Sequence, residues 1–328
     1  MKKLKLGVVG ATGLVGQTFL KLLQEENLLS KIDVVLICSE KSAGKRMLFN
    51  GNECKLFLLS EECLNMKLDV VVMSAGDAVS KKWGKKFIET GAVVVDNTNA
   101  FRHETNVPLI VPEINGTLAN EQNLISNPNC STIQLAIVLN EIQKKSEIET
   151  VVVSTYQSVS GAGKQALLDL QQHRKEFFKF GINKNIIPQI GDISQNGSCA
   201  EENKIMFELN KILNTNLNVC AMTVRVPIPN CHGEAVYVKF KNDVSLNNVE
   251  QMFENKKHIV YLKDDVALPV HCVGTNKTFV CRLKQCSENE IMFFVLADNL
   301  RRGAAFNALE IVKLVKPEIC TGSNQKSW

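Results

Sequence analysis

The chain lacks any uninterrupted apolar run of membrane-spanning length, which would need roughly 18 residues or more. Its opening residues, Met1-Lys2-Lys3, lead straight into a strand-like segment without the cleavage site of a secretory signal peptide. We therefore predict a cytoplasmic protein with no membrane partner.

Cysteine spacings typical of metal sites are also missing. The sequence has eleven cysteines, an odd number, with no Cys-x-x-Cys pair and no zinc-binding spacing. Positions such as Cys38, Cys220 and Cys281 lie in apolar, strand-like runs. We therefore expect reduced and mostly buried thiols, and no metal.

Strong charge of either sign is absent. The formal net charge is only +4, the lysines and arginines are scattered, and no basic stripe interleaved with aromatic residues occurs. This pattern argues against a nucleic-acid partner. The modest positive bias suits anionic substrates and a phosphorylated cofactor.

What the chain does contain is an ordinary globular composition. It has 328 residues, 45% of them apolar and 22% charged, which is enough for two domains with their own cores. The first third alternates strands and helices, and this predicts an α/β fold with a doubly wound parallel sheet. The expected strands are 4–9, 34–38, 69–74 and 92–95, with short apolar pieces at 109–111 and 124–126 and helices at 15–26 and 79–90.

From about residue 147 the pattern changes to longer strands. Several of them alternate apolar and polar residues, as at Val236, Val238 and Phe240, which predicts an antiparallel or mixed sheet with one exposed face. The expected strands are 149–158, 219–226, 234–241, 278–285 and 291–297. The expected helices are 162–178, 201–214, 245–254 and a final one at 299–316.

A glycine-rich turn follows the first predicted strand. Gly10-Ala11-Thr12-Gly13-Leu14-Val15-Gly16 has the spacing Gly-x-x-Gly-x-x-Gly and opens the first predicted helix. Glycines at these places permit a tight turn and close approach of a pyrophosphate, and the helix N-terminus offers N–H groups to its phosphates. The strand and helix context predicts a dinucleotide site.

The end of the second strand indicates which dinucleotide binds. NAD enzymes usually place an acidic residue there for the ribose 2′-hydroxyl. Here Ser39 occupies that position, and Lys41, Ser42 and Lys45 follow closely. Hydroxyl and ammonium groups suit a 2′-phosphate, so we predict NADP, although Glu40 would repel that phosphate if it pointed inward.

Cys130 is distinguished from the other cysteines by its surroundings. It lies in Ser126-Asn127-Pro128-Asn129-Cys130-Ser131-Thr132, just before the apolar run 133–139, which reads as a buried helix. Pro128 favours an extended conformation at Asn127, so Cys130 should sit at a strand-to-helix turn. The N–H groups and dipole of a helix N-terminus favour thiolate over thiol. A nucleophilic thiol beside a nicotinamide cofactor indicates chemistry between an aldehyde and a thioester.

Seven segments in this order resemble one family, the bacterial type of aspartate-β-semialdehyde dehydrogenase. The match covers about residues 4–316, and seven ordered motifs are far more specific than any one of them. The segments are GATGLVG (10–16), SEKSAGK (39–45), Ser74-Ala75-Gly76, DNTNAFR (96–102), SNPNCST (126–132), YQSVSGAG (156–163) and DNLRRGAA (298–305).

The resemblance implies a fold, a reaction and a partner. The fold would pair a Rossmann-type NADP-binding domain, residues 1–129 and 299–328, with an α+β catalytic and dimerisation domain, residues 130–298, as in glyceraldehyde-3-phosphate dehydrogenase. The reaction would be the reversible, phosphate-dependent interconversion of L-aspartate 4-semialdehyde and L-4-aspartyl phosphate with NADP(H). It would feed lysine, diaminopimelate, methionine and threonine synthesis. A homodimer is implied, with a tetramer as an alternative.

Catalytic roles are implied for three residues. Cys130 would attack the acyl phosphate to give a thioester. His232 would move protons, because an imidazole titrates nearest to neutral pH, and beside a thiolate it would favour a charged pair. Gln157 would orient the thioester or its oxyanion. Family members often carry Gly before this histidine, whereas this chain has Cys231.

The remaining site residues follow from the same resemblance. Arg225 would hold the substrate carboxylate, for which a planar guanidinium is well shaped. Glu201 would grip the substrate amine, with Glu202 as the competing assignment, and Arg102 and Lys204 would bind phosphate. The predicted cofactor-binding residues are Gly10, Thr12, Gly13, Leu14, Val15, Gly16, Ser39, Lys41, Ser42, Ser74, Ala75, Gly76, Ser160, Gly161 and Asn299.

Three other hypotheses are open from the sequence. N-acetyl-γ-glutamyl-phosphate reductase shares the fold and the thioester logic, but that family typically has Gly before the cysteine and Tyr after it, where this chain has Asn129 and Ser131. A non-catalytic dinucleotide-binding paralogue should lack the nucleophile or the proton shuttle. A cysteine-based redox sensor would use the second thiol of Cys231.

Overall fold

The computed structural model describes residues 2–320 and divides the chain into two compact units. The first unit takes the residues up to Pro128 together with those from Ala304, and the second takes Asn129–Gly303. We predicted the second boundary at 298/299. Residues 299–303 instead belong to the second unit, where the Asp298 side chain accepts hydrogen bonds from the N–H groups of Leu300 and Arg301.

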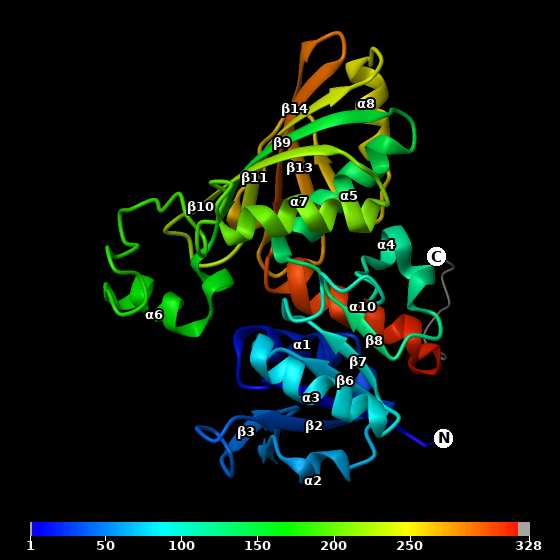
Figure 1. Cartoon of the computed structure of the whole chain (residues 1–328), viewed down its shortest axis with the longest axis vertical. Coiled ribbons are helices and arrows are strands. Elements are labelled where there is room, and N and C mark those ends of the chain that lie inside the picture. The colour runs from blue at the N-terminus through cyan, green and yellow to red at the C-terminus, as the bar shows by residue number, and fades with distance from the viewer. Residues whose placement is uncertain (1, 321–328) are drawn as a thin grey trace. The chain divides into compact units, whose positions relative to one another are not determined.

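The sheet of the first unit is parallel throughout and has the order β5-β2-β1-β6-β7-β8. This is the order of the classic dinucleotide-binding fold, so the predicted doubly wound sheet is confirmed. The strands are β1 Leu4–Val9, β2 Ile32–Cys38, β5 Phe57–Leu58, β6 Val70–Met73, β7 Val93–Asp96 and β8 Leu124–Ser126. Figure 1 labels β2, β6, β7 and β8 of this sheet.

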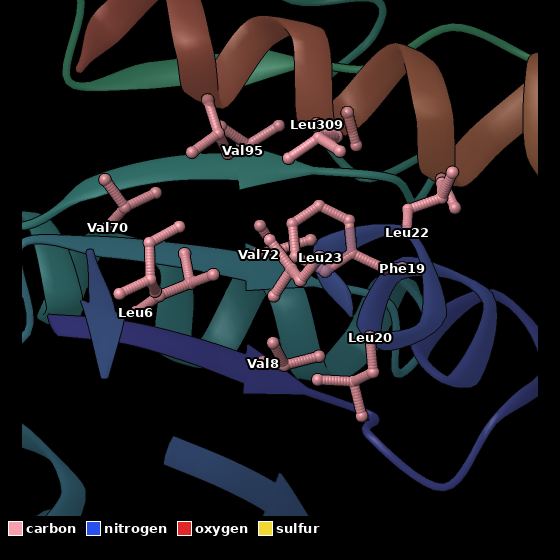
Figure 2. Packing of buried hydrophobic residues seen from close by; sticks show 14 of the residues in the cluster. Leu6, Val8, Phe19, Leu20, Leu22, Leu23, Val70, Val72, Val95 and Leu309 are labelled. Carbon is pink, nitrogen blue, oxygen red and sulfur yellow. The ribbon is translucent and has the colours of Figure 1, made fainter. Parts of the chain in front are cut away.

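Helices cover both faces of this sheet. One face packs against α1 (Leu14–Glu25) and α10 (Phe306–Val315), and Figure 2 shows Phe19 and Leu23 of α1 near Val72 of β6, with Leu309 of α10 near Val95. The other face packs against α2 (Glu61–Leu64) and α3 (Asp77–Glu89). Because successive side chains of a strand point to opposite faces, these largely apolar strands need cover on both sides. The short helix α4 spans Pro112–Asn115.

A hairpin between β2 and β5 was missed by the prediction. Strands β3 (Arg46–Phe49) and β4 (Asn52–Lys55) are antiparallel and are joined by Asn50-Gly51, both with positive φ. Asn-Gly at a two-residue turn is the strongest local signal for such a hairpin. The signal was therefore present in the sequence.

The second unit contains a mixed sheet of order β10-β9-β11-β14-β13-β12. Strands β9 and β10 are parallel, as are β12 and β13, and the other pairs are antiparallel, so the predicted mixed sheet is confirmed. The strands are β9 Ile148–Gln157, β10 Asn218–Arg225, β11 His232–Phe240, β12 Ile259–Leu262, β13 Thr278–Ser287 and β14 Glu290–Ala297.

Helices α5 (Cys130–Gln143), α7 (Ala200–Leu213) and α8 (Leu246–Phe253) pack along this sheet, and short helix α9 (Pro269–Cys272) contacts β14. Two predicted helices were too long. Residues 162–178 form α6 only over Lys164–Gln172, because His173 adopts a left-handed conformation that ends it. Residues 299–316 form a π-helical turn at Arg301–Ala305 and then α10.

Within residues 2–320, no helix is both long and apolar enough to cross a bilayer. Over the same range, no group of three or more His, Cys, Asp and Glu side chains is placed to hold a metal ion. All eleven cysteines are free thiols. The predicted tail from Thr321 lies outside the described residues.

Candidate active site

The glycine-rich turn lies where strand order reverses in the first unit. Gly10 directly follows β1 and has φ +88, and a Cβ at this position would come within 2.5 Å of the Ser74 carbonyl oxygen beyond β6. Only glycine fits such a close approach of two strand ends. Neighbours β1 and β6 send their following helices, α1 and α3, to opposite faces, which makes this edge the topological switch point where dinucleotides bind.

The other predicted cofactor residues of this unit gather on the same edge, because they follow the carboxyl ends of parallel strands. Ser39 and Lys41 follow β2 and are exposed, as are Ala75 and Gly76 after β6. Ser74 accepts a 2.9 Å hydrogen bond from the Asn97 side chain. This edge therefore combines hydroxyl, ammonium and glycine backbone groups that a dinucleotide phosphate could use.

The predicted phosphate pair is divided between the two units. Arg102 lies in the first unit, is 6% exposed, and its Nη2 donates a 2.9 Å hydrogen bond to the Asn97 carbonyl. Lys204 lies on α7 of the second unit and forms an ion pair with Glu201, with 3.1 Å between Nζ and Oε2.

Cys130 is the first residue of α5, as its sequence context predicted. Asn129 is the N-cap, and its side-chain oxygen accepts a 2.9 Å hydrogen bond from the Ser131 N–H. The first-turn N–H groups and the helix dipole therefore face the thiol from its own helix. Gly303 packs on the other side, where a Cβ would come within 2.8 Å of the Cys130 Cβ.

The imidazole of His232 lies beside this thiol, with 3.2 Å between Cys130 Sγ and His232 Nε2. The opposite ring nitrogen, Nδ1, accepts a 3.1 Å hydrogen bond from the Ser158 backbone N–H. Since a backbone N–H can only donate, Nδ1 carries no proton, and the neutral ring carries its proton on Nε2, facing the sulfur. This tautomer is assigned from the hydrogen-bond network.

His232 is held neutral by its surroundings. It is fully buried, and burial together with the positive charge of Arg225 lowers the pKa of its imidazole to about 3. The expected charged pair of thiolate and imidazolium is thus not favoured. The arrangement instead offers a neutral Nε2–H donor to the sulfur.

Arg225 is the buried cation that acts on His232. Burial lowers the pKa of its guanidinium, while Glu201 and Cys130 oppose that shift, and its Nη1 donates a 2.6 Å hydrogen bond to the Ser158 carbonyl. A Cβ at Gly161 would lie 3.1 Å from both Arg225 Nη1 and the His232 ring. Gly161, predicted to contact the cofactor, therefore also makes room for these two side chains.

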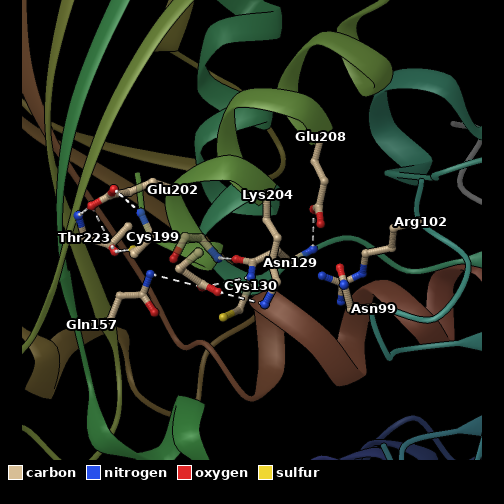
Figure 3. A network of polar contacts seen from close by, with 12 residues as sticks. Asn99, Arg102, Asn129, Cys130, Gln157, Cys199, Glu202, Lys204, Glu208 and Thr223 are labelled. Carbon is tan, nitrogen blue, oxygen red and sulfur yellow. Dashed lines mark hydrogen bonds and ion pairs between the residues drawn. The ribbon is translucent and has the colours of Figure 1, made fainter. Parts of the chain in front are cut away.

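Glu201 joins several polar side chains of the site (Figure 3). Its Oε1 accepts hydrogen bonds from Asn129 Nδ2 at 2.8 Å and from Gln157 Nε2 at 3.2 Å. Burial alone raises the pKa of Glu201, but Lys204, the Asn129 hydrogen bond and Arg225 outweigh it and lower the pKa. Glu201 is therefore an ionised carboxylate.

Glu202 is committed elsewhere. Its two oxygens accept hydrogen bonds from the backbone N–H groups of Cys199 at 2.8 Å and Thr223 at 2.9 Å, which ties the start of α7 to β10. Of the two carboxylates that the sequence left open, only Glu201 contacts Gln157 and Asn129.

Ser160 and Asn299 were predicted to bind the cofactor, and the structure pairs them with each other in the second unit. Asn299 Nδ2 donates to Ser160 Oγ at 3.0 Å, and Asn299 Oδ1 accepts from Ser158 Oγ at 2.9 Å and from the Cys231 N–H at 2.9 Å. These bonds fix the loops on both sides of His232.

Sequence reasoning missed three residues that support the site. Asn129 had a usable signal, since Asn is a preferred N-cap before an apolar helical run. Glu208 lies seven residues after Glu201, which is two helical turns along the same face. Ser158 acts through its backbone N–H and O, so no side-chain pattern could reveal it.

Cys231 occupies the position where glycine was expected. Its φ is +84, in the region that favours glycine, and its thiol is 1% exposed. A hydrogen bond with the Cys272 thiol, and burial, raise the pKa of Cys231. It is therefore a poor nucleophile, which counts against the redox-sensor hypothesis.

Two family models match the chain. Residues 5–122 match the NAD-binding domain of semialdehyde dehydrogenases, and residues 139–302 match their dimerisation domain. Together with the Rossmann-type sheet, these matches place the chain in the class of dinucleotide-binding oxidoreductases that act on semialdehydes.

Individual relatives narrow this class to one family. The aspartate-semialdehyde dehydrogenase of Aquifex aeolicus is 36% identical, over 96% of this chain and 98% of its own length, and that of Bacillus subtilis is 35% identical, over 95% and 97%. The solved structure of aspartate semialdehyde dehydrogenase II from Vibrio cholerae, complexed with ASA, has a TM-score of 0.89 at 34% identity and covers 96% of this chain and 98% of that one. The chain belongs to the aspartate-semialdehyde dehydrogenase family.

Proposed function

We propose that the chain catalyses the reversible conversion of L-4-aspartyl phosphate to L-aspartate 4-semialdehyde, with release of phosphate and use of NADP(H). This reaction would feed lysine, diaminopimelate, methionine and threonine synthesis. The observation that carries the proposal is the 3.2 Å contact between Cys130 Sγ and His232 Nε2 at the N-terminus of α5, in a chain of this family.

Cys130 is the nucleophile of the proposed reaction. Its sulfur forms a bond to the acyl carbon, and the bond from that carbon to the phosphate oxygen breaks, so that phosphate leaves with the electron pair. After reduction at the same carbon, the C–S bond breaks and releases the aldehyde and the thiolate. The α5 N-terminus stabilises the thiolate at both ends of the cycle.

His232 acts as a hydrogen-bond donor. With its proton on Nε2, the neutral ring hydrogen-bonds the thiolate and then the oxyanion of the tetrahedral species formed at the sulfur. The ring keeps this proton, because its loss would leave an imidazolate, and the oxyanion re-forms the carbonyl as the leaving group departs. The Ser158 N–H, bound to Nδ1, keeps the ring in the orientation for both contacts.

The substrate is held by the charged groups around this pair. Arg225 binds the α-carboxylate, Glu201 the α-ammonium group, and Gln157 the acyl oxygen. Arg102 and Lys204 bind the phosphate. Support comes from the ionised state of Glu201 and from its contacts with Gln157 and Lys204.

NADP fits the residues on the switch-point edge of the first unit. The backbone of the Gly10–Gly16 turn would hold the pyrophosphate, and Ser39, Lys41 and Ser42 the 2′-phosphate. When bound, NADP(H) supplies or accepts a hydride at the carbonyl carbon. Position 39 carries a serine where NAD enzymes usually have an acidic residue, which supports NADP over NAD.

A Cys130→Ser variant tests the proposal. We expect unchanged NADP affinity, measured by fluorescence titration, and loss of phosphate-dependent oxidation of aspartate semialdehyde. Cys286→Ser, which removes an exposed thiol of β13, is the matched control and should keep full activity. Turnover by Cys130→Ser well above background would refute the role of this sulfur.

The rival substrate is N-acetyl-γ-glutamyl phosphate. Asn129 and Ser131 flank the cysteine where that family has Gly and Tyr, and the identities above are all to aspartate-semialdehyde dehydrogenases. Assaying both semialdehydes, each with NADP and with NAD, separates the candidates. Preference for N-acetylglutamate semialdehyde would overturn the substrate assignment.

We also propose a homodimer formed through the sheet of the second unit. Three apolar side chains of that sheet are exposed, namely Val152 at 42%, Tyr156 at 40% and Met222 at 54%, in the part of the chain that matches the dimerisation domain. Light scattering should give a dimer for the wild type and a monomer for Met222→Glu. The free thiols also support a reducing, cytoplasmic location.

A further inference from the structure

Asn129, the N-cap of α5, is fixed by three hydrogen bonds. Its Oδ1 accepts from the Ser131 N–H at 2.9 Å, its Nδ2 donates to Glu201 Oε1 at 2.8 Å, and its backbone N–H donates to Glu208 Oε2 at 2.6 Å. The next residue is Cys130. Any rotation or shift of Asn129 therefore moves the thiol directly.

Both carboxylates come from one helix, α7. Glu201 and Glu208 are seven residues apart, so they lie two turns apart on the face of α7 that packs along α5. Glu208 is fully buried, and Figure 3 shows it reaching Asn129 from above the start of α5. Burying a carboxylate costs free energy unless hydrogen bonds compensate for the lost hydration. The Glu208 side chain is therefore held in the orientation that accepts the Asn129 N–H.

Glu208 replaces a missing part of the ordinary helix cap. In a capping box, a Glu or Gln at the third helical position reaches back to the N–H of the N-cap residue. In α5 the third position is Thr132, whose side chain is too short for that bond. The N–H of Asn129 is bonded instead by an acid from another helix.

We propose that Glu208 is a positioning residue for the Cys130 nucleophile, and that it fixes the start of α5 through the backbone of Asn129. This inference rests on the proposed role of Cys130. The negative charge of Glu208 does not help to ionise the thiol, because a nearby anion disfavours a thiolate. Its contribution is therefore the hydrogen bond and not the charge.

Three variants separate these contributions. Glu208→Gln keeps an acceptor for the Asn129 N–H and removes the charge, Glu208→Leu removes both, and Glu250→Leu is the control. Glu250 is another buried carboxylate of the second unit, bonded to Tyr261 and Lys263 of β12 and the turn after it. If Glu208→Leu does not fold, Glu208→Asp, one methylene shorter, takes its place.

We expect Glu208→Leu to lower kcat by roughly 10- to 100-fold, as misplacement of a reacting group by about 1 Å does, with NADP affinity unchanged. Glu208→Gln and Glu250→Leu should stay within about threefold of the wild type, a change below 1 kcal/mol. Alkylation of Cys130, followed by peptide mapping, should persist in every variant. Its pH midpoint should fall in Glu208→Gln and Glu208→Leu, because removal of the anion favours the thiolate.

A folded Glu208→Leu variant with wild-type kcat would overturn the inference, and so would equal losses in Glu208→Gln and Glu208→Leu. Loss of Cys130 alkylation together with kcat would indicate general disorder of the helix start and would also count against it. These outcomes are distinct from failure of the proposed function. In that case Cys130→Ser would still turn over, whatever the Glu208 variants do.

Discussion

The neutral state of His232 makes a prediction about pH. The ordinary pKa of a histidine is 6.5, and burial and Arg225 lower that of His232 to about 3 in the folded protein. Between these two values the unfolded chain binds a proton at this position and the folded protein does not. Stability must therefore fall as the pH is lowered from 6.5, and rise again as it is restored.

The magnitude follows from the size of the shift. Each pH unit within the window is worth about 1.4 kcal/mol for one group, so lowering the pH from 6.5 to about 5 should cost about 2 kcal/mol of unfolding free energy. His232→Gln has no titrating ring and should lack this contribution. The measurement is urea unfolding of both proteins from pH 7 to about 5, with the difference in unfolding free energy plotted against pH.

Nitrogen NMR of labelled histidine gives the direct readout. The His232 signals, identified by their loss in His232→Gln, should stay those of a neutral ring with the proton on Nε2 throughout this pH range. A His232 ring that titrates at or above pH 6.5, or that carries its proton on Nδ1, would refute the argument from burial and from the Ser158 N–H. It would restore the charged pair with Cys130 that the sequence suggested.

Four further predictions concern single positions. At Cys231, φ +84 disfavours every side chain, so Cys231→Gly should be more stable than Cys231→Ala by about 1 kcal/mol in thermal unfolding; the usual order, with alanine more stable, would show that the backbone there is unstrained. Gly303→Ala should press on Cys130 and cost about 1–3 kcal/mol of stability together with activity, and a fully active, equally stable variant would contradict the packing described. Lys41→Glu should raise the KM for NADP roughly tenfold, equivalent to about 1.4 kcal/mol, and leave that for NAD nearly unchanged; equal effects on both would move the 2′-phosphate site elsewhere. Arg225→Lys should lower kcat/KM for the semialdehyde by roughly 10- to 100-fold, because an ammonium cannot reproduce the charge-assisted pair of bonds worth about 1.5–3 kcal/mol, and unchanged kinetics would place the carboxylate at another residue.

Local features of the fold were predictable from sequence because short-range physics decides them. Strand β1 was predicted at its observed bounds, Leu4–Val9, and the position of Cys130 near the start of a helix was predicted from Pro128 and the apolar run 133–139. The overlong helix predicted at 162–178 failed for a local reason as well. The Asp169 side chain accepts hydrogen bonds from the N–H groups of Phe177 and Phe178, which a helical pattern does not reveal.

Long-range features of the site were not accessible in this way. Cys130 and His232 are 102 residues apart in sequence, and only the family resemblance brought them together before the structure did. The neutral state of His232 depends on Arg225 and on complete burial, which no motif encodes. The hydrogen bond from the Asn129 N–H to Glu208 likewise depends on how α7 packs along α5.

The first unit is built from two separate segments of the chain. Its core contains residues of α1 from the first segment and of α10 from the second. During synthesis the first unit therefore cannot complete its core until Phe306–Val315 has been made, because α10 covers part of one apolar face of its sheet. The second unit, which is continuous in sequence, can mature first. Removal of α10 should therefore make the first unit sensitive to proteolysis and leave the second unit, which contains Cys130, folded.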